Sequence, residues 1–373
     1  MSIYFDNAAT TPISKEVLDE MLPYLTVNFG NPSSIHQNGR KVKTAIETAR
    51  KIVAKVVNAS IGEIFFTSGG TESNNTALKS AVQSLGIERI ITSVTEHPCV
   101  LNSIKHIQKY HNIEIIHLEV DAFGQIDYDK LDETLKLNDK LTLVSLMHGN
   151  NEIGTMIDLD IVSNICQQNK ALFHTDAVQT VGHFKIDLQK TKIHFLSASA
   201  HKFHGPKGIG FLYINNDIKI DPFIDGGGQE RNMRSGTENV ANIVGLSKAI
   251  ELYDSEIVER TNQISQIKAY FIEQLKQNKF DFEINGAIEK SLYTVLSISL
   301  PRNEKSDMLL MLLDIDGVCV SGGSACSSGA ETKSHVIEAL NNKDDRRTIR
   351  FSFSHYNTKN EVDNVINLLK KYI

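Results

Sequence analysis

A lysine that could perform amine chemistry follows a β-rich run in the segment SASAHK, residues 197–202, and precedes a Gly-Pro pair at 205 and 206. Lys202 is therefore expected at the end of a buried strand, among small side chains. A lysine held in such a place can lose its proton more readily and form a Schiff base with a carbonyl group. Taken alone, Lys202 is better interpreted as an ordinary solvated lysine. His201 and His204 have a spacing compatible with metal binding, but no third ligand of matching order follows, so no metal site is expected.

A cysteine with small neighbours is the second candidate. Residues 321–330 read SGGSACSSGA, which places Cys326 among glycine, serine and alanine. Such a composition favours an exposed loop, where a thiolate can reach a partner and act as a nucleophile. A passive thiol in a linker is the alternative. The other cysteines, Cys99, Cys166 and Cys319, lie in or beside periodic apolar segments and are interpreted as core residues or bystanders.

Two glycine-containing segments could bind an anion. Residues 64–74, IFFTSGGTESN, read as a strand, a turn and the start of a helix, whose free N–H groups and dipole favour a phosphate. The alternative is an ordinary turn with Thr71 as the helix N-cap. A nucleotide P-loop and a GxGxxG fingerprint are both absent from this segment. Residues 226–237, GGGQERNMRSGT, are either a surface linker or an anion-binding loop that reaches a second subunit.

A carboxylate is expected at the same edge of the sheet. Asp176 follows a β-rich run in the segment HTDAVQ, residues 174–179, and open α/β sheets bind ligands at the carboxyl ends of their strands. A buried carboxylate there needs a cation or hydrogen-bond donors. A protonated ring nitrogen would suit Asp176, and a simple capping role is the alternative.

The elements that must position these residues alternate between short β-rich runs and helical segments. Several runs are apolar at consecutive positions, which is typical of strands covered on both faces. About seven strands are predicted at residues 64–67, 90–93, 113–120, 141–147, 171–175, 193–197 and 209–214. Helices are predicted at residues 37–57, 71–84, 98–110 and 159–169. The pattern predicts an α/β fold, with a large domain built on a mainly parallel seven-stranded sheet between helices.

The pattern changes after residue 236. Residues 238–277 contain no proline and one glycine, so they predict one long helix that can bridge two domains. The segments beyond it indicate a smaller α+β domain, with strands at residues 294–300, 318–320 and 348–353 and helices near 307–315, 332–340 and 359–372. We expect the large domain to span residues 15–259 and the small domain to combine residues 1–14 with 260–373.

The composition limits the classes of protein to which this chain can belong. The 373 residues include 39 Lys and Arg and 45 Asp and Glu, a net charge of −6, which disfavours direct nucleic-acid binding. Four scattered cysteines do not form a disulfide framework, and no apolar run approaches the roughly 18 residues of a membrane span. A cytoplasmic protein with free thiols, without a membrane partner, is expected.

Taken together and in order, the segments resemble the cysteine desulfurases. These are a branch of the class-V aminotransferases, which are pyridoxal-phosphate enzymes of fold type I. The resemblance covers nearly the whole chain and adds further motifs, which are YFDNAATTP at 4–12, FGNPSS at 29–34, TEH at 95–97, NNEIG at 150–154, AHK at 200–202, MRSGT at 233–237 and RFS at 350–352. The loop around Cys326 is the most specific of them, because related aminotransferases lack it.

The resemblance implies a role for each candidate. Lys202 would form the Schiff base with pyridoxal 5'-phosphate, Asp176 would pair with the pyridine nitrogen, and His97 would stack on the ring and assist proton transfer. Asn151 and Gln179 would contact ring substituents. The phosphate would be bound by Gly70, Thr71, Ser199 and His201, together with Thr237 from the neighbouring subunit of a homodimer. Arg350, with Asn151, would hold the substrate carboxylate.

The implied reaction converts L-cysteine to L-alanine and leaves the sulfur on Cys326 as a persulfide. The catalytic residues would be Lys202, His97 and Cys326. The sulfur would pass to an acceptor protein, such as an iron–sulfur scaffold or a tRNA-thiolation enzyme. The alternatives are a selenocysteine lyase, an aminotransferase of the same group, and a catalytically idle sulfur-carrier or scaffold subunit.

Overall fold

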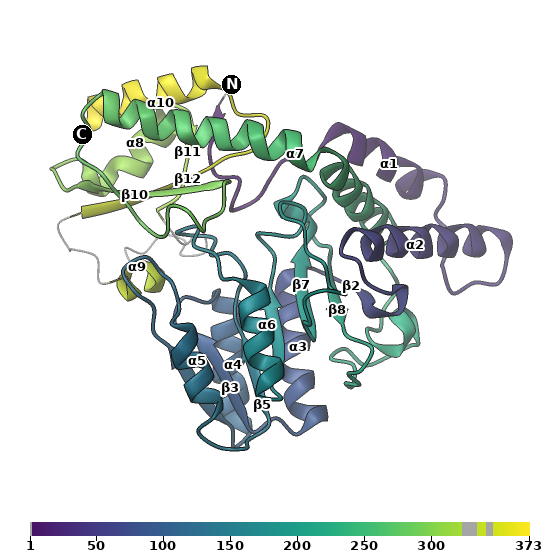
Figure 1. Ribbon diagram of the computed structural model, residues 1–373. Coiled ribbons are helices and arrows are strands. Elements are labelled where there is room, and N and C mark those ends of the chain that lie inside the picture. The colour runs from purple at the N-terminus through teal and green to yellow at the C-terminus, as the bar shows by residue number, and fades with distance from the viewer. Residues whose placement is uncertain (1, 323–333, 341–345) are drawn as a thin grey trace.

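The computed structural model describes residues 2–322, 334–340 and 346–373 (Figure 1). Its largest sheet has seven strands in the order β2-β8-β7-β6-β5-β3-β4. Their bounds are β2 Ile64–Thr67, β3 Arg89–Ser93, β4 Glu114–Leu118, β5 Thr142–Ser145, β6 Leu172–Asp176, β7 Phe195–Ser199 and β8 Gly210–Ile214. Strand β8 is antiparallel to both of its neighbours, and the other pairs are parallel. The predicted mainly parallel, seven-stranded sheet is therefore confirmed.

Apolar side chains cover both faces of this sheet. Neighbouring residues on one strand point to opposite faces, so Phe195 and Leu196 of β7 enter different apolar clusters. Ile90 and Ile91 of β3 divide in the same way. This two-sided burial is why the strands read as consecutive apolar residues rather than as an alternating pattern.

Helices flank the sheet in Figure 1, where α3 and α4 stand behind the strands and α5 and α6 in front of them. The bounds of the helices up to the long one are α1 Lys15–Thr26, α2 Gln37–Val56, α3 Gly70–Leu85, α4 Pro98–Tyr110, α5 Tyr128–Leu135, α6 Leu159–Gln168 and α7 Val240–Gln277. Short 3₁₀ turns are η1 Ile61–Glu63, η2 Ala200–Lys202, η3 Gln229–Asn232 and η4 Ser306–Met308. The predicted helices agree with the observed ones to within two residues, whereas α1 and α5 are additional.

A second, smaller layer lies beside the sheet. An antiparallel sheet in the order β12-β10-β9 packs with helices, and a short parallel pair joins β1 to β11. The bounds are β1 Ile3–Tyr4, β9 Glu283–Ile284, β10 Val295–Pro301, α8 Leu309–Ile315, β11 Val318–Cys319, α9 His335–Ala339, β12 Arg346–Ser352 and α10 Lys359–Tyr372. Phe5, Phe271 and Phe351 meet in its core, so both ends of the chain contribute to it.

Helix α7 connects the two layers without a break. Side chains of its first half, such as Ile243 and Leu246, pack in the core of the large sheet. Side chains of its second half, such as Phe271 and Leu275, pack in the core of the smaller layer. Figure 1 shows α7 running across the upper part of the molecule from one layer to the other. Within the described ranges, no helix has the length and apolar character that crossing a membrane would need.

Candidate active site

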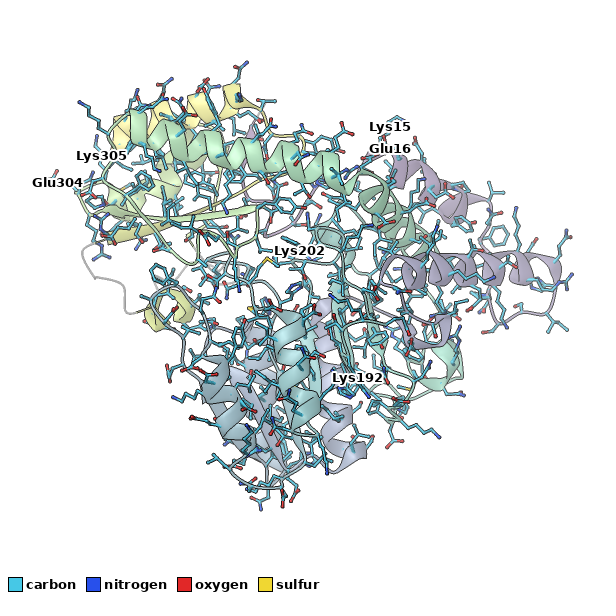
Figure 2. The ribbon with its side chains drawn as sticks, in the orientation of Figure 1. Lys15, Glu16, Lys192, Lys202, Glu304 and Lys305 are labelled. Atoms are coloured by element: carbon cyan, nitrogen blue, oxygen red, sulfur yellow. The ribbon has the colours of Figure 1, made fainter. Side chains whose placement is uncertain are left out.

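Lys202 lies where β7 ends, on the turn η2. Figure 2 shows it near the middle of the molecule, between the two layers, whereas Lys192, which precedes β7, lies at the opposite end of the sheet. The Nζ atom of Lys202 donates hydrogen bonds to the carbonyl oxygens of Ala8 at 2.6 Å and Ala9 at 2.8 Å. The N-terminal segment therefore reaches the lysine directly. The carbonyl oxygen of Lys202 itself lies 3.0 Å from Nε2 of His183.

Asp176 occupies the carboxyl end of β6 and is only 5% exposed. Its Oδ2 atom accepts a hydrogen bond of 2.6 Å from Nδ2 of Asn74, and its Oδ1 atom accepts one of 3.0 Å from the backbone N–H of Val178. These donors satisfy part of the hydrogen-bonding capacity of a buried carboxylate. Asn74 lies on α3, so a helix and a strand jointly hold Asp176.

His97 precedes α4 and caps its N-terminus. Its Nδ1 atom accepts a hydrogen bond of 3.2 Å from the backbone N–H of Cys99, and the Sγ atom of Cys99 lies 3.0 Å from the same nitrogen. Burial lowers the pKa of His97, and the charge of Lys202 lowers it further, while Asp176 acts in the opposite direction. The imidazole is thus favoured in its neutral form.

A hollow opens at the start of α3. It has a volume of about 340 Å³ and is lined in part by Gly69, Gly70 and Thr71. The helix begins at Gly70, and its N-cap is Gly69, so the alternative of an ordinary turn with Thr71 as N-cap does not hold. Glycine supplies no capping side chain, and the first N–H groups of a helix lack partners within it. The backbone of this turn can therefore donate to an anion.

The remaining predicted phosphate ligands border the same hollow. Ser199 and His201 line it, together with Thr10 and Lys207. The Nδ1 atom of His201 lies 3.2 Å from Oγ1 of Thr10. Burial lowers the pKa of His201 to about 4, and Lys202 and Lys207 add to this effect, so His201 is neutral at pH 7. The hollow combines neutral hydrogen-bond donors with one lysine and one carboxylate, that of Glu72, which is paired with Arg234.

Arg350 is fully buried, and its guanidinium already has two hydrogen-bond partners. Its Nη2 atom pairs with Oδ1 of Asp6 at 2.8 Å, and its Nη1 atom donates to the carbonyl oxygen of Asn151 at 2.9 Å. Among the described residues, its Nε atom is buried without a hydrogen-bond partner. Gln179 donates from Nε2 to the carbonyl oxygen of Ala8 at 3.0 Å. The structure thus joins Arg350 to Asn151 and brings Gln179 to the same N-terminal segment as Lys202.

The glycine-rich loop 226–237 is tied to the large sheet rather than extended as a free linker. Arg234 forms a two-bond ion pair with Glu72 of α3, at 2.9 and 3.2 Å. Glu230 is buried and accepts from both Nη atoms of Arg50, at 2.6 and 2.9 Å. Thr237 is exposed on the surface of this chain. The anchors hold the loop beside α3, so a side chain at its exposed end can face a neighbouring molecule.

Cys326 lies outside the described residues, and so does most of the segment SGGSACSSGA. The described residues before and after that gap contact the site. Ser321 donates to Oδ1 of Asp6 at 2.8 Å, and Nε2 of His335 lies 2.9 Å from the carbonyl oxygen of Glu96. The described residues that flank this gap, Ser321 and His335, therefore lie next to the residues of the site.

Several site residues are not identified by sequence reasoning. Asp6, Thr10 and Lys207 lie at the site, although nothing in their spacing singles them out. Asn74 looks like an ordinary helix residue, and Cys99 packs at the edge of an apolar cluster, as a core residue should. The packing of Cys99 agrees with its interpretation as a core residue, and its sulfur also contacts His97 and Asn74, which its apolar surroundings in the sequence do not reveal. No group of three or more potential metal ligands occurs among the described residues.

Known proteins are similar to this chain over most of their length. The aminotransferase class-V family matches residues 3–365. A cysteine desulfurase IscS from Dictyoglomus turgidum is 44% identical over 375 residues, covering 100% of this chain and 94% of the relative. A putative cysteine desulfurase IscS 1 from Bacillus subtilis is 42% identical and covers 96% of this chain and 95% of the relative.

Solved structures agree with the sequence relatives. A NifS-like protein has a TM-score of 0.92 and 36% identity, covering 100% of this chain and 99% of that one. A structure described as SspA in complex with cysteine has a TM-score of 0.83 and 34% identity, covering 96% and 100%. The chain therefore belongs to the class-V aminotransferase family, within its cysteine desulfurase branch.

Proposed function

We propose that the chain is a pyridoxal-phosphate-dependent cysteine desulfurase. One observation carries the proposal: a single edge of the sheet brings together the Lys202 amine, the Asp176 carboxylate and the anion cradle at the start of α3. A lysine, an acid and a phosphate site are the groups that pyridoxal phosphate requires of a protein. The cysteine desulfurase relatives supply the substrate, L-cysteine.

The residues fit the cofactor in chemistry as well as in place. The backbone of Gly70 and Thr71, with Ser199 and His201, would hold the phosphate. The hollow tolerates no larger residue at 70 without movement, because a Cβ atom there would lie 2.5 Å from Cγ2 of Val178. Lys202 would hold the aldehyde carbon. Asp176, already fixed by Asn74, would accept a hydrogen bond from the protonated ring nitrogen.

Four further residues would complete the cofactor and substrate contacts. Asn151 and Gln179 would contact ring substituents, and His97 would contact the ring. Arg350 would bind the substrate carboxylate through its Nε–H and the N–H groups that Asp6 and Asn151 leave open. Its burial removes competing water, which strengthens a charge-assisted hydrogen bond.

The chain's own groups would then move protons and sulfur. Pyridoxal phosphate, when bound, withdraws electrons from the substrate Cα and so makes the Cα proton acidic and the bond from Cβ to sulfur weak. The Lys202 amine would accept the Cα proton. The Cys326 thiolate would attack the substrate sulfur, so that an S–S bond forms while the Cβ–S bond breaks and Cβ gains a proton. The products balance as L-alanine and a persulfide on Cys326.

A homodimer would complete the phosphate site. Thr237 would reach the phosphate of the neighbouring subunit from its exposed position. Apolar side chains that a monomer leaves in water support a covering second copy. They lie on α1 and in the segment that follows it, and they are Leu22, Leu25, Val27, Phe29 and Ile35. A reducing cytoplasm would suit the free thiol of Cys326, and the persulfide would pass to an acceptor protein for iron–sulfur cluster assembly or tRNA thiolation.

The proposal is tested by incubating the purified, cofactor-loaded protein with L-cysteine and a thiol reductant. Alanine and sulfide should form in equal amounts. Cys326→Ser should keep the visible absorbance of the bound cofactor and lose alanine formation. Cys166→Ala, which alters a cysteine buried in the core of the large sheet, is the matched control and should stay active. Amino transfer to a keto acid, with no sulfide released, would instead indicate an aminotransferase.

A further inference from the structure

The orientation of the Asn74 amide is fixed by its neighbours. Asp176 is acceptor-only when ionised, so the group 2.6 Å from its Oδ2 atom must be the NH₂ of Asn74. The same Nδ2 atom lies 3.2 Å from Sγ of Cys99. Asn74 therefore donates to both, and the sulfur of Cys99 accepts on this side. The single thiol proton of Cys99 is left to point elsewhere.

Two more side chains reach this sulfur: the Thr71 hydroxyl, which can donate to it, and Nδ1 of His97, which can accept the thiol proton. The Nδ1 atom of His97 lies 3.0 Å from Sγ of Cys99 and also 3.2 Å from the backbone nitrogen of Cys99. A backbone N–H can only donate, so Nδ1 must present a lone pair and cannot carry a proton. The ring proton of a neutral His97 then resides on Nε2. The S–H and the N–H of the same residue converge on one ring nitrogen.

We propose that Cys99 is a positioning residue for His97. Its thiol donates to Nδ1 and holds the imidazole neutral, with the proton on Nε2. Through Asn74 it joins His97 to Asp176, so that the carboxylate facing the ring nitrogen and the histidine contacting the ring belong to one hydrogen-bond network. The significance for catalysis rests on the proposed function, whereas the network itself does not.

Other charged groups near His97 also shift the equilibrium between its neutral and its protonated form. Asp176 and Glu152 favour the imidazolium, whereas Lys202 and His335 disfavour it, and burial disfavours it more than any of them. These opposing charges partly cancel. Hydrogen bonds to Nδ1 therefore add to burial as a specific reason for a neutral ring. Burial also raises the pKa of the Cys99 thiol to about 12, so the donor stays protonated throughout the neutral range.

The tautomer can be read directly by ¹⁵N NMR of the histidine-labelled, cofactor-loaded protein, with His97 assigned from the signal lost in His97→Gln. The wild type should show a neutral ring protonated on Nε2 at pH 7. Cys99→Ala removes the thiol donor and leaves the backbone N–H, so the pKa of His97 should rise by about one unit, the scale of one net hydrogen bond. Cys99→Ser retains a donor and should restore the wild-type titration.

Two controls separate this inference from the function. Cys166→Ala should leave the His97 signals unchanged, because Cys166 lies on α6 in the apolar core. If the protein forms alanine from cysteine, the acid limb of its kcat/KM profile should move to higher pH in Cys99→Ala alone. An Nδ1–H tautomer, or identical His97 titration in wild type and Cys99→Ala, would overturn the positioning role even if desulfurase activity is found. A protein without that activity can still show the predicted tautomer.

Discussion

At the scale of single residues, Arg350 is a buried cation that two neighbouring groups hold in place. Asp6 neutralises it, and the backbone of Asn151 orients it. A buried arginine without a carboxylate partner would carry a large desolvation cost. The ion pair with Asp6 therefore stabilises the buried guanidinium of Arg350. Its remaining N–H groups are available as donors to a second carboxylate.

Replacing this guanidinium should weaken substrate binding selectively. Arg350→Gln should raise KM for L-cysteine about 10- to 100-fold, the range expected when a hydrogen bond to a charged group is lost. Steady-state alanine formation measures this effect, and the absorbance of the bound cofactor should stay as in the wild type. Asp281→Asn, which alters an exposed partner of Arg346 away from the site, is a surface control. An unchanged KM would remove Arg350 from the substrate site.

The sequence predicts chemistry-bearing residues better than their supports. Lys202 and Asp176 are recognisable because each follows a β-rich run, and strand ends meet at one edge of a sheet. Asn74 and Asp6 are not recognisable in this way. The sequence around an asparagine within a helix, or around an aspartate near the N-terminus, does not differ from that around a solvated residue. Their partners, Asp176 and Arg350, are distant in sequence. Only the tertiary fold brings these pairs together.

At the scale of elements, the start of α3 is fitted to the turn that follows β6. Gly70 contacts that turn so closely that an added Cβ atom would lie 2.5 Å from Cγ2 of Val178 and 3.8 Å from Cβ of Ser199. The obstacle is one flexible side chain. Real Cβ atoms do not approach so closely, so a larger residue must push α3 or Val178 aside.

This contact predicts that a substitution at Gly70 is damaging and that a second substitution at Val178 corrects the damage. Gly70→Ala should lower the free energy of unfolding by about 1–3 kcal/mol, as overpacking does, and should weaken cofactor binding by moving the cradle. Val178→Ala in the same chain removes the obstructing methyl groups and should restore most of both losses. Urea unfolding and cofactor titration measure the two effects. If the double variant were as impaired as Gly70→Ala alone, the close contact would not be the cause.

Element prediction succeeds where one local signal dominates. Strands buried on both faces contain apolar residues at consecutive positions, and α2 repeats its apolar residues every three to four positions, so these elements are predicted nearly to their ends. Helix α1 contains Pro23 in its interior, a residue that normally ends a helix, and α5 has only 8 residues, which is about two turns. The antiparallel direction of β8 depends on its tertiary pairing with β2 and β7.

At the scale of the whole molecule, helix α7 connects the two layers and packs in the core of each. We propose that the boundary between residues 15–259 and the small domain of residues 1–14 and 260–373 falls within this helix. Side chains on its two halves enter separate cores, which supports the division. Residues 8 and 9 nevertheless reach Lys202, so the N-terminal segment contacts the catalytic edge of the large sheet.

Buried histidines should make the fold sensitive to acid. Burial lowers the pKa of His148 and His183 to about 4, and of His174 and His204 to about 3. Each is neutral when folded but takes up a proton below about pH 6.5 when unfolded. The unfolded state therefore binds more protons as the pH falls from about 6.5 to about 4, and stability is lost in that window.

The expected slope is about 1.4 kcal/mol per pH unit for each such histidine. Urea midpoints measured from pH 7 to pH 5 should fall steeply. His148→Gln should make the fall shallower, whereas His117→Gln, at an exposed position on β4, should not. A urea midpoint that did not change with pH would contradict the neutral, buried state of these side chains.

The central claim is that sulfur leaves L-cysteine and arrives on Cys326. Intact-mass and peptide mass spectrometry of the cofactor-loaded protein, after reaction with L-cysteine and without reductant, tests it most directly. We expect the mass of the protein to increase by one sulfur atom located on Cys326, with one alanine released for each sulfur gained. Cys326→Ser should show no such increase. Alanine released with no sulfur on Cys326, or sulfur retained in Cys326→Ser, would contradict it.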